Sequence, residues 1–223
     1  EEFERGPARY TAHWAGGFCA GRVPVDASPT YLRSRGAAQR IRQTIPSELH
    51  SGLRFVAVLR EPMACGLSFY NQQRALGLAN ASSFGAHVAL QLRLVGRRWN
   101  DLEAGFYADD LERWFEVFPR SQTFVVSFDS LLLEPEATLL RLGAFLGLEG
   151  GEWARLSRQG LPWKNAQRHE GKLSVGDIDP DTCRRLASLY APHNARLLAL
   201  LSQPGSPPQQ PPFPPFRSSC AAG

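Results

Sequence analysis

Residues 54–73 read RFVAVLREPMACGLSFYNQQ, and this stretch decides the fold. Its opening run, Arg54–Leu59, is almost continuously apolar, which is typical of a strand covered on both faces of a parallel sheet. The Glu61-Pro62 pair then predicts a turn, and a helical pattern follows from Met63 to Leu76. The stretch therefore predicts a buried strand that leads directly into a helix.

Further strands and helices are predicted on both sides of this stretch. A second apolar run, Thr123–Phe128 (TFVVSF), and a short β-branched stretch, Arg22–Val25, are also predicted strands. Because helical patterns separate these strands, we expect an α/β fold with a central parallel sheet. The predicted helices cover Tyr31–Thr44, Met63–Leu76, Ser83–Trp99, Tyr107–Phe118, Glu136–Leu146 and Asp181–Leu201.

The composition agrees with one folded domain. The chain has 223 residues, of which 43% are hydrophobic and 21% are charged, and these fractions exclude global disorder. No apolar run approaches the roughly 20 residues of a transmembrane helix. The net charge of +4 is small and scattered, so nucleic acid is not an expected partner. The cysteines and histidines show no metal-ligand spacing, so no metal is expected.

The two ends of the sequence differ from the rest. Residues 203–216 are rich in proline and lack hydrophobic periodicity. We therefore expect a domain over residues 1–201 and a Pro-rich disordered or polyproline II tail over residues 202–223. The sequence begins at Glu1 with neither a Met nor a signal peptide, so we expect it to start inside a longer protein. A membrane anchor would then lie in a segment absent from this sequence.

Arg60 and Ser68 are the residues of the opening stretch from which we expect chemistry. Arg60 lies at the carboxyl end of the predicted strand, where parallel sheets bind ligands, and Ser68 lies about two turns into the helix. A guanidinium and a hydroxyl placed in this way can bind one anion together. The alternative is a surface arginine and an ordinary helical serine, and spacing alone leaves both interpretations open.

A similar arrangement follows the predicted strand at Arg22–Val25. Ser28 precedes Pro29, and Pro is favoured in a first helical turn, so Ser28 is expected to cap a helix that begins after Pro29. Asp26 and Ser28 are also candidates for a ligand site, although capping is the simpler role. Tyr31 is expected to pack against neighbouring residues.

LREPMACGLSFYNQQ resembles the 3′-phosphate-binding segment of sulfotransferases that use 3′-phosphoadenylyl sulfate (PAPS), with the family's Arg, Pro and Ser at Arg60, Pro62 and Ser68. DASPTYL resembles the strand-to-helix segment of the Golgi carbohydrate sulfotransferases, including the heparan sulfate type. The Gly-x-Tyr motif at Gly105 and Tyr107 is similar to another of the family's motifs. The stretch over residues 105–148 and the closing helical stretch SLYAPHNARLLALL also resemble the family, and the resemblance as a whole covers roughly residues 1–201.

The resemblance implies a P-loop NTPase-like three-layer fold and an enzyme that moves a sulfuryl group from PAPS to a hydroxyl or amine of a glycan acceptor. It implies that Arg60 and Ser68 bind the 3′-phosphate of PAPS. Glu2 is the expected catalytic base for the acceptor, with Glu1 as the fallback, and Lys164 and Arg168 are expected to be further contacts to PAPS. The alternative for these residues is an ordinary solvated surface. A member of this type is expected in the Golgi lumen, anchored to the membrane in its full-length form.

The sequence also departs from the family. The Gly-rich loop that binds the 5′-phosphosulfate should precede the catalytic Glu, and no residue stands before Glu1, so we expect this stretch of chain alone to be inactive. Cys65 replaces a second Arg found in many members, and Ala27 replaces a Lys of the heparan type. A non-catalytic glycan- or nucleotide-binding relative therefore stays an alternative, as does a P-loop kinase. The sequence alone leaves open the acceptor, the choice of O- or N-sulfation, and which of the four cysteines form a disulfide.

Overall fold

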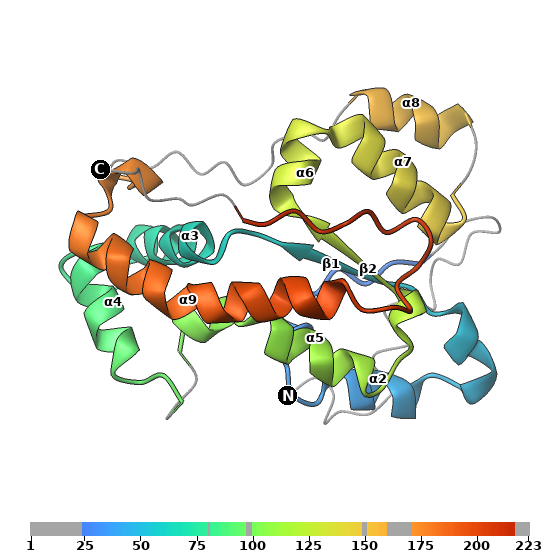
Figure 1. The fold of residues 1–223 in the computed structure, drawn as a ribbon, viewed down its shortest axis with the longest axis horizontal. Coiled ribbons are helices and arrows are strands. Elements are labelled where there is room, and N and C mark those ends of the chain that lie inside the picture. Colours follow the sequence, from blue (N-terminus) through green and yellow to red (C-terminus); the bar gives the residue numbers. More distant parts are fainter. Residues whose placement is uncertain (1–23, 80, 97–99, 149–150, 160–170, 217–223) are drawn as a thin grey trace. The chain divides into compact units, whose positions relative to one another are not determined.

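The structure is a computed structural model that describes residues 24–79, 81–96, 100–148, 151–159 and 171–216 (Figure 1). The chain divides into two compact units, Glu1–Gly52 and Leu53–Gly223. The described part of the first unit holds α2 (Ala37–Thr44) and the 3-10 helix η2 (Ser47–Gly52).

The second unit holds a parallel pair of strands and the helices that surround it. Its described elements are β1 (Phe55–Leu59), α3 (Pro62–Ala75), α4 (Phe84–Leu92), η3 (Leu102–Gly105), α5 (Tyr107–Phe115), η4 (Arg120–Gln122), β2 (Thr123–Ser127), α6 (Phe128–Leu133), α7 (Pro135–Leu146), α8 (Gly151–Gln159), η5 (Val175–Asp177) and α9 (Pro180–Leu201).

The two strands confirm the parallel sheet that the sequence predicts. β1 pairs with β2 in parallel, from Phe55 opposite Thr123 to Leu59 opposite Ser127. Parallel neighbours need a long crossover connection, and here the segment from α3 to η4 provides it. Because the register is even, both strands end at the same level, and the residues that follow them leave the sheet side by side.

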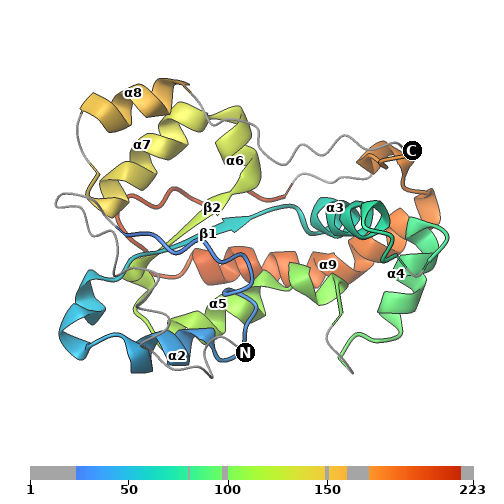
Figure 2. The same ribbon diagram turned by 180° about the vertical axis from the view of Figure 1, so that it is seen from behind.

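Helices cover both faces of this sheet, which gives three layers. Both views show α6 and α7 on one side of the strands and α5 and α9 on the other (Figures 1 and 2). On the first face, Phe124 and Val126 of β2 form a buried cluster with Phe145 of α7. On the second face, the ring of Phe55 lies edge-on to Trp114 of α5, with ring centroids 5.1 Å apart.

The two strands differ in burial. Every residue of β2 is buried, as its apolar sequence predicts. In β1, however, Val56 is 41% exposed and Val58 is 50% exposed, so the prediction that this strand is covered on both faces is wrong. The physical reason is that α6 and α7 pack on β2 rather than over β1. Because side chains alternate along a strand, Arg60 lies on the same face of the sheet as the exposed Val56 and Val58.

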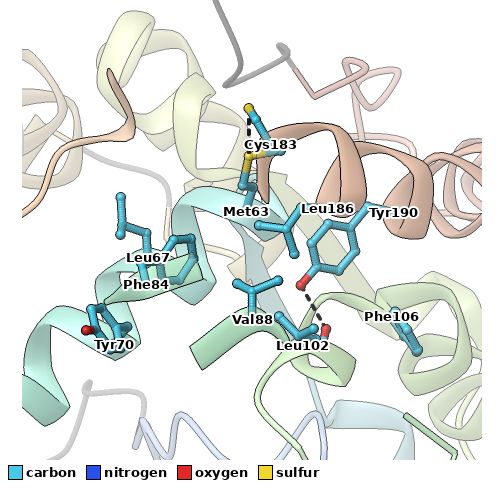
Figure 3. Close-up of a cluster of buried hydrophobic side chains, with 10 residues drawn as sticks. All are labelled: Met63, Leu67, Tyr70, Phe84, Val88, Leu102, Phe106, Cys183, Leu186 and Tyr190. Atoms are coloured by element: carbon cyan, nitrogen blue, oxygen red, sulfur yellow. Dashed lines mark hydrogen bonds between the residues drawn. The ribbon is translucent and has the colours of Figure 1, made fainter. Parts of the chain in front are cut away.

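A hydrophobic cluster fixes the start of α3 against α4, η3 and α9 (Figure 3). Leu186 of α9 lies inside this cluster with 0% exposure, and burial of one such side chain contributes about 1.5–3 kcal/mol. The Tyr190 hydroxyl donates a hydrogen bond to the Leu102 carbonyl at 3.0 Å. The sulfur atoms of Cys183 and Met63 lie 3.7 Å apart. α3 therefore begins from a rigid base directly behind the carboxyl end of β1.

Three predicted helices are shorter in the structure, and the one predicted over Tyr107–Phe118 ends at Phe115. The helix predicted over Tyr31–Thr44 begins only at Ala37, with Gly36 as its N-cap. The helix predicted over Ser83–Trp99 ends at Leu92, and Gly96 soon follows with a φ of 73°, which a helix does not allow. Of the strand predicted over residues 22–25, only residues 24 and 25 are described, and they form no strand.

The Pro-rich segment after α9 lies along β2. The Gln210 side chain donates from Nε2 to the Val125 carbonyl at 2.6 Å and accepts from the Val125 amide at 2.7 Å. Prolines cannot donate ladder hydrogen bonds, so a side-chain amide here takes the place of a neighbouring strand at the edge of β2. The domain boundary predicted between residues 201 and 202 stays a prediction, although the residues beyond it contact the sheet.

Candidate functional site

Arg60 follows directly after the last residue of β1, at the carboxyl end of the sheet. Its side chain is half-buried, and its Cζ atom lies 5.3 Å from the centroid of the Phe128 ring. Among the described residues, none forms a hydrogen bond or ion pair with this guanidinium. By contrast, Arg113 on α5 pairs with Asp110. A half-buried guanidinium with unused in-plane N–H donors is suited to bind an oxyanion.

The turn between β1 and α3 is built by Glu61 and Pro62. The Glu61 carboxylate caps the helix, because it accepts hydrogen bonds from the backbone amides of Met63 at 3.0 Å and Ala64 at 2.7 Å. Pro62 occupies the first helical position, where its missing N–H costs no hydrogen bond. Since Glu61 already uses these amides of α3, an anion at this end of the sheet depends on side chains such as Arg60.

Tyr107 holds the backbone of Arg60 from the start of α5. Its hydroxyl donates a hydrogen bond to the Arg60 carbonyl at 2.8 Å, and its side chain is only 7% exposed. Burial raises the pKa of Tyr107 well above its ordinary value, and the neighbouring Cys65 raises this pKa further. The phenol therefore stays protonated at neutral pH and remains a hydrogen-bond donor.

Gly105 allows the surrounding elements to approach one another. A Cβ atom at Gly105 would lie 2.6 Å from the Cβ of Pro62 and 2.7 Å from the Cε1 of Tyr190. Any larger residue would therefore push η3 away from the start of α3 or from α9. The Gly-x-Tyr motif thus has two structural uses here: its glycine permits close packing behind the turn, and its tyrosine binds the end of β1.

Ser68 lies on the exposed side of α3. The helix rise puts it about 10 Å along the axis from Glu61, on the same helical face. Cys65, a half-buried free thiol, lies between them on this face. Within the described residues, Ser68 and Arg60 are not hydrogen-bonded to each other, so only a ligand would join them. Apart from Cys65, Cys183 is the other described cysteine, and it is disulfide-bonded.

Three of the predicted site residues, Glu2, Lys164 and Arg168, lie outside the described residues, so their roles stay predictions. In the first unit, Ser28 donates to Asp26 at 2.8 Å, and the Tyr31 hydroxyl donates to the same carboxylate at 2.8 Å. The prediction that Ser28 caps a helix after Pro29 is wrong, because residues 29–33 form turns.

Sequence reasoning missed Phe128 and did not assign a role to Tyr107. The signal for Phe128 was present, because it ends the second apolar run just as Arg60 follows the first. The sequence does not show the register between the two strands, and this register is what places Arg60 and Phe128 side by side. The contact between Tyr107 and Arg60 depends on tertiary packing over a long sequence separation.

In the part of the chain that the structure describes, no group of three or more His, Cys, Asp or Glu side chains could hold a metal ion. None of the helices formed by the described residues is both long enough and apolar enough to cross a membrane.

Comparisons with known proteins agree on one family. Residues 34–159 match the sulfotransferase domain family. The chain is 26% identical to human heparan sulfate glucosamine 3-O-sulfotransferase 3B1 over 194 residues, covering 79% of this chain and 47% of the relative. It is 24% identical to human bifunctional heparan sulfate N-deacetylase/N-sulfotransferase 3, covering 82% of this chain and 22% of the relative. The chain thus spans about half the length, or less, of these curated relatives.

A solved structure shares the fold. A sulfotransferase from Alicyclobacillus acidocaldarius superimposes with a TM-score of 0.65 at 24% sequence identity, covering 88% of this chain and 71% of that one. This likeness, together with the parallel sheet and its helical layers, confirms the predicted P-loop NTPase-like three-layer fold.

Proposed function

Because this chain belongs to the sulfotransferase domain family, we propose that the protein transfers a sulfuryl group from PAPS to a hydroxyl or amine of a glycan. One observation carries the proposal within the described residues. Arg60 presents a half-buried guanidinium, with no hydrogen bond or ion pair to any described residue, at the carboxyl end of a parallel strand. This is where open α/β sheets bind their ligands.

In this proposal, Arg60 binds the 3′-phosphate of PAPS through paired N–H donors, and Ser68 adds its hydroxyl from α3. The buried cap at Glu61 and the hydrogen bond from Tyr107 fix the position of the Arg60 backbone. Preformed contacts of this kind lower the entropic cost of holding the donor in line with the acceptor. Lys164 and Arg168 are proposed to add positive charge around the donor.

The proposed transfer step exchanges one bond at sulfur for another. The bond between the sulfuryl sulfur and the 5′-phosphate oxygen breaks, and a bond from the acceptor oxygen or nitrogen to sulfur forms. Adenosine 3′,5′-bisphosphate leaves with the electron pair of the broken bond. The Glu2 carboxylate is proposed to accept the proton of the acceptor.

The proposed acceptor is a glycan of the heparan sulfate class, because the curated relatives carry heparan sulfate in their names. An enzyme for this acceptor is proposed to work in the Golgi lumen, with membrane anchoring in its full-length form. Cys183 is disulfide-bonded, which agrees with an oxidising compartment such as this lumen.

Transfer of labelled sulfate tests the proposal directly. The full-length protein is incubated with ³⁵S-labelled PAPS and heparan sulfate, or with chondroitin sulfate as a matched polyanion. We expect label in heparan sulfate and release of adenosine 3′,5′-bisphosphate. If the protein binds the bisphosphate but labels no member of a glycan panel, it is a binding relative rather than a transferase. If it binds ATP tightly without preference for a 3′-phosphate, the proposal is overturned in favour of a kinase.

A further inference from the structure

We propose that Phe128 is a positioning residue for Arg60: its ring holds the face of the guanidinium and leaves the in-plane N–H donors free for the 3′-phosphate. The inference rests on the proposed function, because it names the residue that prepares the same site. It starts from the distance of 5.3 Å between the Arg60 Cζ atom and the Phe128 ring centroid.

The sheet register produces this contact. Leu59 and Ser127 are the last paired residues of β1 and β2, so Arg60 and Phe128 are the next residues on their chains. Side chains alternate along a strand, so Arg60 follows Val58 on one face of the sheet, and Phe128 follows the residue paired with Val58 on that same face. The strand register therefore brings the side chains of Arg60 and Phe128 together at the carboxyl end of the sheet.

The geometry of arginine makes this contact compatible with ligand binding. A guanidinium binds an aromatic ring through its flat face, whereas its five N–H donors lie in the plane and point outward. A carboxylate beside Arg60 would occupy those same donors and compete with a phosphate. An aromatic ring attracts the cation without using a donor, and it limits the rotamers that a long side chain would otherwise explore.

Neighbouring contacts fix both members of the pair. Phe128 is the half-buried first residue of α6, and the Ser127 hydroxyl caps this helix by accepting a hydrogen bond from the Asp129 amide at 3.2 Å. On the other side, Tyr107 binds the Arg60 carbonyl at 2.8 Å. Arg60 is thus held at its backbone by one aromatic residue and at its charged end by another.

A double-mutant cycle tests the proposal. Isothermal titration calorimetry measures the affinity of the full chain for adenosine 3′,5′-bisphosphate and for adenosine 5′-monophosphate, which lacks the 3′-phosphate. The variants are Phe128→Leu, Phe128→Tyr, Arg60→Ala and the double variant Arg60→Ala/Phe128→Leu. Phe128→Met replaces Phe128→Leu if the latter does not fold.

We expect Phe128→Leu to weaken bisphosphate binding about fivefold and to leave monophosphate binding unchanged, because only the contact to the 3′-phosphate depends on the orientation of Arg60. Phe128→Tyr keeps the ring and should bind like the wild type. In the Arg60→Ala background, Phe128→Leu should have no further effect.

Three kinds of result would overturn the proposal. If Phe128→Leu weakens both nucleotides equally, or weakens bisphosphate binding in the Arg60→Ala background too, Phe128 has only a structural role. If Arg60→Ala weakens bisphosphate binding while Phe128→Leu does not, the proposed 3′-phosphate site stands and only the role of Phe128 fails. If Arg60→Ala itself leaves bisphosphate binding unchanged, the 3′-phosphate site of the proposed function fails, and the role of Phe128 fails with it.

Discussion

The two ends of β1 carry the same pair of residue types in different surroundings. At the amino end, Arg54 is exposed, lies 5.9 Å from the ring of Phe145 and donates a hydrogen bond to the Leu53 carbonyl at 2.9 Å. At the carboxyl end, Arg60 is half-buried and lies 5.3 Å from the ring of Phe128, and no described residue shares its N–H donors.

The difference between the two ends shows what prepares a binding site. An arginine near a phenylalanine occurs at both ends, so this contact alone does not mark function. At the carboxyl end, a buried tyrosine fixes the arginine backbone, a capped helix begins at once, and a glycine admits the close packing behind the turn. The carboxyl end is thus rigid around a cation whose donors are unused by the described residues.

The largest expected effect is on nucleotide affinity, when the arginines at the two ends of β1 are removed one at a time. Arg60→Ala should weaken the binding of adenosine 3′,5′-bisphosphate about 100-fold, since a bidentate charged contact contributes about 3 kcal/mol. Arg54→Ala removes the same charge from the other end of the strand and should change this affinity less than about twofold. Titration calorimetry on both variants measures the difference. Equal losses would mean that general charge, rather than the carboxyl end, binds the nucleotide.

The next effect concerns the packing behind the turn. Gly105→Ala should lower the free energy of unfolding by about 1–3 kcal/mol, because the new methyl group would overlap Pro62 and Tyr190. Gly66→Ala is the matched control within α3, since a Cβ there would meet no atom within 4 Å apart from its chain neighbours and the adjacent helix backbone, and it should not destabilise the protein. Urea denaturation compares the two. An unchanged stability of Gly105→Ala would show that the carboxyl end is less tightly packed than the structure has it.

A smaller effect is expected at the tyrosine that binds the Arg60 carbonyl. Tyr107→Phe removes one hydrogen bond and should lower the free energy of unfolding by about 1 kcal/mol at pH 7. Burial raises the pKa of Tyr107 in the folded state. Wild-type stability should therefore fall as the pH rises above about 10, where the unfolded chain loses this proton first. In chemical denaturation from pH 7 to 11, the free energy of unfolding should fall less steeply with pH for Tyr107→Phe than for the wild type. An equally steep fall in both proteins would contradict the raised pKa of Tyr107.

The smallest effect on ligand binding is expected away from both ends, at the middle of β2. Gln210→Ala removes two hydrogen bonds to the Val125 backbone and should lower the melting temperature by a few degrees, in line with about 1 kcal/mol. Bisphosphate affinity should stay unchanged. A loss of affinity as large as that of Arg60→Ala would show that nucleotide binding follows overall stability instead of the carboxyl end of β1.

Much of this region could be predicted from the sequence. The apolar run up to Leu59 and the Pro-marked helix start placed Arg60 at a strand end, and both were confirmed. The exposure of Val56 and Val58 could not be predicted, because it depends on where α7 lies over the sheet. The neighbours of Arg60 could not be predicted either. Phe128 is placed beside it by the register of β1 and β2, and Tyr107 by a contact between segments far apart in the sequence. Local patterns specify elements, whereas the contacts of a site come from their packing.

The central claim is that the carboxyl end of β1 binds the 3′-phosphate through Arg60. A crystal structure of the protein with adenosine 3′,5′-bisphosphate tests it most directly. We expect two guanidinium nitrogens of Arg60 to donate hydrogen bonds to 3′-phosphate oxygens while the guanidinium face stays on the Phe128 ring. A nucleotide bound with its 3′-phosphate away from Arg60 would contradict the account.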